Sequence, residues 1–568
     1  MKRIFAYLKP YIGRMTVGFL VKFSGTVVEL MLPWILSYVI DDVIPHKDVG
    51  MIIQWGGVML LCALVAWAFN IIANRMASLV SRNTTEQIRN DLFTKMIYLS
   101  NHQVDMVTMP SLISRATSDT YNIHQMLGMI QRLGVRAPIM LLGGIIITLT
   151  LDPVLTLAMI SVTPFIICIV TFTGRRGIPM YGHLQKLVDR FVRVVREDVT
   201  GIRVIKALSK VEYEKEKFKS ANEDVVDQEQ RAGRVMSLLN PIMNICLNMG
   251  IVLVVIVGAY RVNSGVTEPG KIIAFMTYVT LILNAILFVS RMFIIYSKAS
   301  ASAKRINEIM DMKEELNVLD IPKVDNGFSV QFDHVSFSYN KKEHNLSEID
   351  FGIKKGETLG IIGATGAGKT TLVNLLMRFY DVDSGAIRIN GEDVRAMDKK
   401  ELREKFGVVF QNDFIYADTI YENIRFGRNI TEDDIMDAAK FARAWEFIEG
   451  KQGGFQSEVN IKGANLSGGQ KQRLLISRAL AGSPEILILD DSSSALDYKT
   501  DAALRKELRE HFQETTTILI AQRISSIMSA DHIMVLDEGK MVGYGRHEEL
   551  MKTCDIYREI SISQMGEA

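Results

Sequence analysis

The first 300 residues alternate long apolar stretches with long charged ones. A helix needs about 20 mostly apolar residues to cross a bilayer. Six stretches meet this need, and they lie at residues 15–40, 52–80, 133–151, 154–173, 239–260 and 271–296. The third and fourth are separated by Asp152 and Pro153, which favour a tight turn at the membrane surface. The pattern predicts an α-helical transmembrane domain with six spans over residues 1–300.

The connections between these stretches are unequal, because residues 81–132 and 175–238 are long and charged and the other three are short. Basic residues are enriched in cytoplasmic loops. We therefore expect a multi-pass protein of the cell (inner or plasma) membrane, with both long connections and both termini in the cytoplasm. Apolar residues recur within the long connections, so the helices are expected to continue beyond the bilayer.

The N-terminal segment MKRIFAYLKPYIGR mixes basic residues with aromatic and aliphatic ones. This composition suits a short elbow helix on the inner membrane surface, and a frayed terminus is the alternative.

After the sixth stretch the apolar pattern ends, and residues 301–328 are read as a linker that contains Pro322 and Gly327. Residues 329–568 alternate short apolar runs with helical patterns, which predicts a soluble α/β domain.

Composition supports membrane insertion, since 48% of the residues are hydrophobic. The formal net charge of +1 gives no reason to expect nucleic acid as a partner. The four cysteines are far apart, which excludes a disulfide framework or metal-ligand spacing, and they are expected to be buried free thiols: Cys62, Cys168, Cys246 and Cys554.

The segment GATGAGKTT fits the phosphate-loop pattern between a strand and a helix. Its residues are expected to bind the phosphates of ATP: Gly363, Ala364, Thr365, Gly366, Ala367, Gly368, Lys369, Thr370 and Thr371. Lys369 would reach the β- and γ-phosphates, and the Thr370 hydroxyl would be a Mg²⁺ ligand. Asp490 ends an apolar strand and would hold the Mg²⁺ shell through water. The second domain is thus an α/β P-loop nucleotide-binding domain.

A second polar, glycine-rich segment, LSGGQ at residues 466–470, opens another helix and offers a further set of N–H groups for an anion. Two such surfaces cannot reach the same γ-phosphate within one compact domain. The sequence therefore indicates a partner domain that faces this one head to tail.

The pairing of GATGAGKTT with LSGGQKQR resembles the nucleotide-binding domain of ATP-binding cassette proteins, and the six spans resemble the membrane half of the exporter branch of that family. The resemblance implies that Tyr339 stacks on adenine and that Gln411 links Mg²⁺ to the membrane domain. It implies that the segment Ser467, Gly468, Gly469 and Gln470 binds the γ-phosphate held by the other subunit. It also implies that short helices near residues 118–125 and 211–218 dock on the nucleotide-binding domains.

Two residues depart from the family pattern at the catalytic end of the site. Asp491 stands where the family has glutamate, and its carboxylate is pulled back by roughly 1.5 Å. Gln522 stands where the family has histidine, and an amide cannot take up a proton. Loss of a general base typically costs about 10² to 10⁴ in rate. A third departure places Asn460 and Ile461 where a Gly-Glu pair is usual.

These departures resemble the degenerate-site subunit of a heterodimeric bacterial multidrug-type exporter. The partner would be a second half-transporter with a competent Glu and His, and the cargo an amphipathic drug, lipid or peptide. A homodimeric exporter, an ATP-binding regulatory membrane protein that transports nothing, and drift in a still active enzyme are the alternatives.

Ionisable residues inside the predicted spans suggest a cavity or pathway. Lys22 and Glu29 are seven residues apart in the first span, and Asn284 and Arg291 have the same spacing in the sixth. Pairing of Lys22 with Glu29, or snorkelling to the surface, is an equally open interpretation. Methionine is abundant, with 29 residues, which suits either an adaptable cavity wall or plain packing.

Overall fold

A computed structural model describes residues 1–324, 326–492 and 495–565. The chain forms two compact units. The helical unit contains Met1–Ile97 and Met109–Met312, and the α/β unit contains Tyr98–Thr108 and Lys313–Ala568. The side chain of Arg291 lies outside the described part, so its predicted role is not addressed by the structure.

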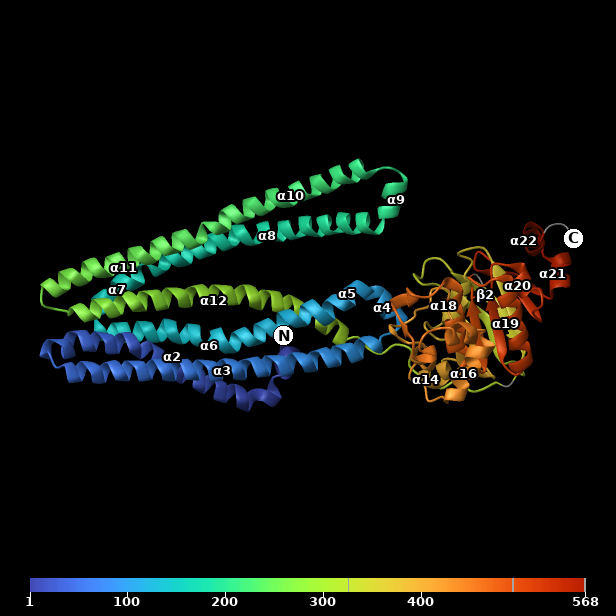
Figure 1. Cartoon of the computed structure of the whole chain (residues 1–568), viewed down its shortest axis with the longest axis horizontal. Helices are drawn as coiled ribbons and strands as arrows, with labels where there is room; N and C mark the ends of the chain where they lie inside the picture. Colours follow the sequence, from blue (N-terminus) through green and yellow to red (C-terminus); the bar gives the residue numbers. More distant parts are fainter. Residues whose placement is uncertain (325, 493–494, 566–568) are drawn as a thin grey trace. The chain divides into compact units, whose positions relative to one another are not determined.

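The helical unit is built from long helices and several short ones (Figure 1). They are α1 (Lys2–Ala6), α2 (Ile12–Tyr38), α3 (Val49–Ile97), α5 (Met109–Ser114), α6 (Thr120–Leu151), α7 (Pro153–Ser161), α8 (Thr163–Thr200), α9 (Ile202–Ala207), α10 (Val211–Ser237), α11 (Leu239–Asn263) and α12 (Pro269–Met310). Within the described residues, five helical segments are long and apolar enough to cross a membrane, and they start at Val49, Met109, Pro153, Val211 and Pro269. The first predicted span is helical as α2, but the count of six spans stays a prediction.

The Asp152-Pro153 pair forms the tight turn that its sequence predicts. Helix α6 ends at Leu151 and α7 begins at Pro153. The Asp152 carboxylate accepts hydrogen bonds from the backbone N–H groups of Val154 and Leu155, so it caps α7. Its other oxygen accepts from Arg261 Nε at 2.9 Å, which ties the turn to α11.

The helices continue well beyond a bilayer thickness, as expected, since α3 has 49 residues and α12 has 42. Helices α2, α6, α11 and α12 bury a common apolar core around Phe275 and Tyr278. The Tyr278 hydroxyl donates to the carbonyl oxygen of Leu30 at 2.6 Å, which satisfies the one polar atom of this buried ring. Helices α8 and α10 run side by side, with α9 at their shared tip (Figure 1).

Lys22 and Glu29 of α2 each pair with a neighbouring helix. The buried Lys22 ammonium donates to Asn70 Oδ1 at 2.7 Å and Asn74 Oδ1 at 3.2 Å, both on α3. Glu29 instead pairs with Arg136 of α6 at 2.6 Å. A spacing of seven residues leaves two helical turns between the side chains, and partners on neighbouring helices are nearer. The Lys22–Glu29 pairing considered from sequence is therefore wrong.

The cysteines are free, as expected, but they are not all buried. Cys554 is buried in the α/β unit, whereas Cys168 is exposed on α8. An apolar run in a membrane helix can face outward as well as inward, so apolar neighbours in sequence did not predict burial here.

The α/β unit contains a six-stranded sheet in the order β12-β11-β3-β10-β9-β6. Its strands are β3 (Thr358–Gly363), β6 (Phe406–Val409), β9 (Ile486–Asp490), β10 (Thr516–Ile520), β11 (His532–Asp537) and β12 (Lys540–Gly545). All neighbours pair in parallel except β11 and β12. Every residue of β9 is buried, as in a parallel strand covered on both faces. Parallel strands place their carboxyl ends at one edge, and this edge carries the phosphate loop and Asp490.

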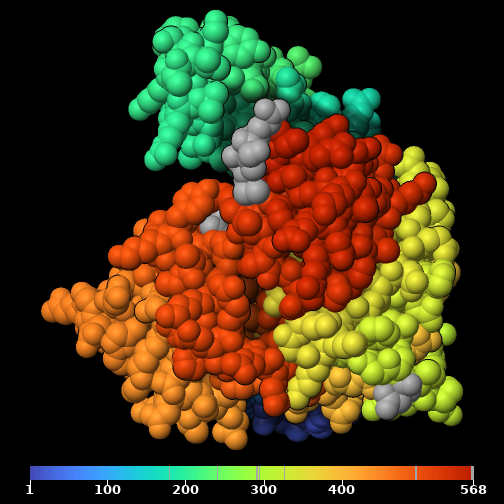
Figure 2. Space-filling model, turned by 90° about the vertical axis from the view of Figure 1, so that its right-hand side faces the viewer, coloured from blue at the N-terminus to red at the C-terminus, as the bar shows by residue number. Residues whose placement is uncertain are grey.

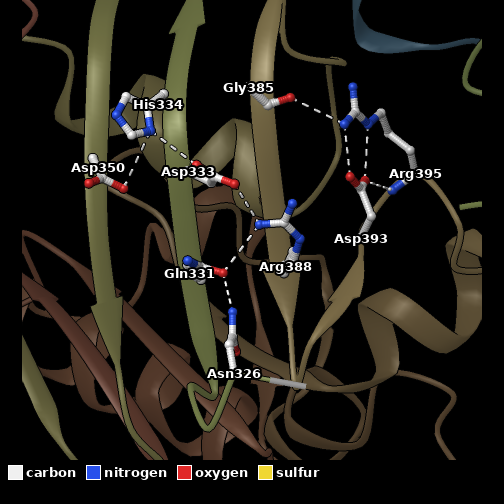
Figure 3. Close-up of polar contacts among 9 residues, drawn as sticks. All are labelled: Asn326, Gln331, Asp333, His334, Asp350, Gly385, Arg388, Asp393 and Arg395. Atoms are coloured by element: carbon white, nitrogen blue, oxygen red, sulfur yellow. Dashed lines mark hydrogen bonds and ion pairs between the residues drawn. The ribbon is translucent and has the colours of Figure 1, made fainter. Parts of the chain in front are cut away.

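A second, antiparallel sheet has the order β2-β1-β4-β5, formed by β1 (Val330–Phe337), β2 (Leu346–Ile353), β4 (Ser384–Ile389) and β5 (Glu392–Asp393). Polar side chains pair across its inner strands, β1 and β4 (Figure 3). Arg388 donates to Asp333 at 2.8 Å, and His334 lies 3.0 Å from the other Asp333 oxygen. These partners hold the pKa of Asp333 below its usual value and that of His334 above it. The Asp333 carboxylate is thus already paired with Arg388 and His334. We therefore assign this cluster to holding neighbouring strands of the sheet together.

The first long connection contributes a short segment to the α/β unit. Residues Tyr98–Thr108 contain α4 (Asn101–Val107), and Gln103 Nε2 donates to the carbonyl oxygen of Lys313 at 2.8 Å. The short helix expected at residues 118–125 does not form, and docking of this segment on a nucleotide-binding domain stays a prediction. Those residues continue into α6 in the helical unit, where the buried Asp119 pairs with Arg305 of α12. Residues 211–218 are likewise the start of the long α10, and the tip helix is α9.

Candidate nucleotide site

The phosphate loop connects β3 to α13 (Lys369–Leu376), and close packing makes its glycines necessary. A Cβ atom on Gly363 would lie 2.1 Å from the carbonyl oxygen of Leu536. Gly368 has a φ of +101°, and its Cβ would lie 2.7 Å from Leu346 Cδ2. Ala364, Thr365 and Gly366 are exposed, whereas Ala367 and Thr371 are buried beneath the loop. The loop can therefore present backbone N–H groups and the start of α13 to an anion.

Lys369 lies back across this loop. Its ammonium donates to the carbonyl oxygens of Gly363 at 2.7 Å and Ala364 at 2.8 Å. Burial lowers the pKa of Lys369, and the carboxylates of Asp490 and Asp491 act in the opposite direction. A polyanionic ligand on the loop would likewise favour the charged ammonium.

Thr370 and Asp490 bring two oxygen donors together at the end of β9. The Thr370 hydroxyl donates to Asp490 Oδ2 at 3.2 Å, and Asp490 is only 2% exposed. Burial raises the pKa of Asp490, and the hydrogen bond from Thr370 opposes this. A hard divalent cation prefers such oxygen donors and would offset the cost of the buried charge. The donor set fits Mg²⁺.

The structure brings the two departing residues into direct contact. Gln522 Nε2 donates to Asp491 Oδ2 at 3.0 Å. Asp491 has a φ of +51°, in the left-handed region, and its N–H donates to the carbonyl oxygen of Ile520. Burial raises the pKa of Asp491, whereas Lys369, Arg523 and Gln522 lower it. One of the carboxylate oxygens thus accepts from an amide that has no titratable proton.

Tyr339 has an exposed ring beside the start of α13. Its hydroxyl accepts from Asn374 Nδ2 at 3.3 Å and lies 3.5 Å from Thr371 Oγ1. The ring packs edge-on against Tyr380, with 5.0 Å between centroids. The ring is 41% exposed, and an exposed aromatic ring at this position suits stacking on a planar base.

Tyr380 connects this site to α4. Its hydroxyl donates to Asp105 Oδ2 at 2.6 Å, between residues 275 positions apart in the chain. Burial and this hydrogen bond raise the pKa of Tyr380. Sequence reasoning missed the contact, because neither residue belongs to a motif and local patterning carries no information about so distant a pair.

The LSGGQ segment begins α18 (Gly468–Leu480) with a capping box. Ser467 Oγ accepts from the N–H of Gln470 at 3.3 Å, and Gln470 Oε1 accepts from the N–H of Ser467 at 3.0 Å. These hydrogen bonds are local, and among the described residues none of them joins this segment to the phosphate loop. Ser467 and Gly468 are exposed, so the N-terminus of α18 is accessible to an anion.

Gln411 follows β6, the strand that pairs with β9, so it lies at the same edge of the sheet as Asp490. Its side chain is exposed, and no hydrogen bond joins it to Thr370 or Asp490 within the described part of the chain. Ile461 is 63% exposed and follows Asn460, which precedes a short turn of helix (Ile461–Gly463). This places an apolar side chain on the surface just before the LSGGQ segment.

Comparison with protein families gives two matches that together span most of the chain. The model of the ABC transporter transmembrane region matches residues 15–286. The model described as ABC transporter matches residues 346–494.

Individual proteins match over the full length. The ABC transporter ATP-binding protein YfiB of Bacillus subtilis is 33% identical over 572 residues, covering 100% of this chain and 99% of that protein. The putative ABC transporter ATP-binding protein exp8 of Streptococcus pneumoniae is 30% identical and covers 100% and 97%. A solved structure of a bacterial Atm1-family ABC exporter with ATP bound has a TM-score of 0.81 at 25% identity, covering 99% of both chains.

Proposed function

Since the chain belongs to the ABC transporter family, as an exporter half-transporter with an ATP-hydrolysing domain, we propose that it is the degenerate-site subunit of a heterodimeric exporter. The subunit would bind ATP in its own pocket, hydrolyse it slowly, and complete a competent site on its partner. The cargo would be an amphipathic compound, moved out of the cytoplasm by alternating access.

The observation that carries this proposal is the hydrogen bond from Gln522 to Asp491. A general base must lie within hydrogen-bond reach of the water that it activates. Here the carboxylate is one methylene shorter than glutamate, and it is held by an amide that cannot donate a titratable proton. Both features weaken hydrolysis and leave nucleotide binding intact.

The binding part of the site is assigned to residues on the phosphate-loop edge. Lys369 and the N–H groups of residues 363–371 would bind the phosphates, and Tyr339 would stack on adenine. Thr370 and Asp490 would hold Mg²⁺, with Gln411 completing its shell. Bound Mg²⁺ would neutralise charge on the triphosphate.

The catalytic part is divided between two chains. Ser467, Gly468, Gly469 and Gln470 would bind the terminal phosphate of ATP held by the partner. In return, the partner would supply a glutamate and a histidine for its own pocket. A homodimer would instead contain two pockets with Asp491 and Gln522.

Surface features of the helical unit support the proposed contact with a partner protein and the proposed location in a membrane. The tip formed by α9 and its neighbours exposes apolar side chains: Val199, Ile202, Val204, Leu208, Val211 and Tyr213. Such a surface suits burial against another protein. We place the subunit in the inner or plasma membrane, with the α/β unit and both termini in the cytoplasm.

The proposal is tested by measuring ATP hydrolysis of the full-length chain in lipid nanodiscs, alone and with its candidate partner subunit. We expect near silence alone and sustained turnover in the complex. Brisk hydrolysis by the chain alone would contradict the proposal.

Two variants separate the role of the LSGGQ segment from that of Asp491 within the complex. Gly468→Asp should abolish turnover, because its carboxylate would repel the phosphate bound by the partner. A Cβ at Gly468 meets only Ala495 Cβ at 3.7 Å, so this chain can accommodate the change. Asp491→Asn should change turnover less than about twofold, against the 10² to 10⁴ typical for a working base. A large loss in Asp491→Asn would reverse the assignment.

A further inference from the structure

A cavity of about 280 Å³ lies in the α/β unit and is lined in part by residues of β9 and β10. Its walls are α19 (Tyr498–His511) and residues 526–531, which include the end of α20 (Ile524–Ile527), and its floor includes Gly356 and Thr358. Figure 2 shows this hollow between orange-red and red surfaces, with yellow atoms at its base. Its volume is close to the lower limit for small-molecule sites.

One wall of the cavity is apolar. Leu504, Leu508 and Phe512 line it from α19 and the residue that follows, and Leu519 lines it from β10. A planar or aliphatic body could bury its surface against these side chains.

The polar wall carries two guanidinium groups, Arg505 and Arg509. Arg505 is fixed in place, because it donates to the carbonyl oxygen of Ser525 at 2.7 Å and pairs with Asp501. Arg509 has no hydrogen bond or ion pair within the described part of the chain, and its charge acts with burial to lower the pKa of Arg505. Two guanidiniums on one wall favour an anionic partner.

The acidic groups of the lining are already engaged. Asp501 pairs with Arg505, and Asp531 accepts a hydrogen bond from the N–H of Thr358 at 2.8 Å. The guanidinium of Arg509 is thus the charge that remains available to a ligand at this wall.

From these contacts we infer that the cavity binds a small organic anion with an apolar body, and that the ligand regulates the nucleotide site. Leu489 and Ser492 also line the cavity, and they flank Asp490 and Asp491 in sequence. The opposite wall, at residues 526–531, lies a few positions after Gln522 in sequence. An occupant would therefore contact both segments that carry the Asp491–Gln522 hydrogen bond. This inference concerns ligand binding and its effect on ATP affinity, and it does not depend on the proposed heterodimer.

Naphthalene-2-sulfonate serves as the probe, with naphthalene-2-sulfonamide as its uncharged counterpart. Binding is measured by isothermal titration calorimetry on the full-length chain in nanodiscs, with empty nanodiscs as the blank. We expect saturable binding of the sulfonate and about tenfold or weaker binding of the sulfonamide, because a charge-assisted hydrogen bond is lost. Absence of saturable sulfonate binding would overturn the inference.

Variants of the lining residues test whether the probe binds in this cavity. Arg509→Gln should weaken sulfonate binding by about tenfold or more, and Ser529→Trp, which fills the mouth, should abolish it. Lys506→Gln is the matched control, since it removes one positive charge from the same helix at an exposed residue that does not line the cavity. This variant should bind the sulfonate with unchanged affinity. Equal affinity in Arg509→Gln, Ser529→Trp and the wild type would overturn the site.

Regulation is read from ATP affinity, measured with and without saturating probe in the wild type and in Ser529→Trp. We expect the probe to shift the affinity in the wild type alone. The same affinity with and without bound probe would overturn the regulatory part of the inference.

Discussion

Two neighbouring aspartates show how strongly the backbone decides the role of a residue. Asp490 ends a buried strand, faces Thr370, and is almost inaccessible to solvent. Asp491 follows in the left-handed region and turns its carboxylate toward Gln522. We propose that the first serves binding and that the second is too short to serve catalysis. Burial raises the pKa of both carboxyl groups, although Asp491 is only partly buried.

The raised pKa of Asp490 leads to a prediction about stability without nucleotide. Because the folded-state pKa lies above the unfolded value, the folded protein binds this proton more tightly. The free energy of unfolding therefore falls as pH rises from the unfolded pKa through the folded one. In Asp490→Asn this fall is absent, and above that window the nucleotide-free variant should unfold at the same temperature as the wild type or higher.

The same variant should bind Mg-ATP about 10- to 100-fold more weakly, as is typical when a partner of a metal shell is lost. Thermal unfolding over a pH series, with and without Mg-ATP, measures both effects. Asp437→Asn, an exposed acid on α16 (Glu432–Phe441), is the control and should change neither. A lower unfolding temperature of Asp490→Asn without nucleotide would show that the buried charge is stabilising.

Among the secondary-structure elements, α4 is the one whose position matters most for function. It comes from the first long connection and reaches the α/β unit through Gln103 and Asp105. Asp105 holds Tyr380, and Tyr380 packs on Tyr339. A base stacked on Tyr339 would therefore restrict a chain of contacts that ends on α4.

Tyr380→Phe tests this chain of contacts, because it keeps the ring and removes the hydroxyl that Asp105 accepts from. In the wild type, ATP should slow backbone hydrogen exchange in α4. In Tyr380→Phe this response should be lost, while the ATP affinity changes by no more than about fivefold, since one exposed hydrogen bond contributes only about 1 kcal/mol. Tyr544→Phe is the control, because the Tyr544 hydroxyl donates to the carbonyl oxygen of Gly352 instead. The same α4 exchange with and without ATP in the wild type would refute the connection.

At the scale of the whole chain, sequence predicted the parts that local chemistry decides. The phosphate loop was predictable because its glycines are needed where a side chain would collide with Leu536 or Leu346. The turn at Asp152 was predictable because a capping acid and a proline determine it locally. The partners of Lys22 and Glu29, and the position of residues 118–125, depend on which helices become neighbours. No local pattern records that choice, and the Tyr380–Asp105 contact was hidden for the same reason.

The most direct test of the account asks which nucleotide each pocket holds during turnover. The complex is labelled under turnover with 8-azido-ATP that carries ³²P at either the α or the γ position, and the two chains are separated. We predict that this chain retains γ-label in proportion to α-label, because ATP stays intact beside Asp491, while the partner loses γ-label. Loss of γ-label from this chain, with its α-label kept, would contradict the account.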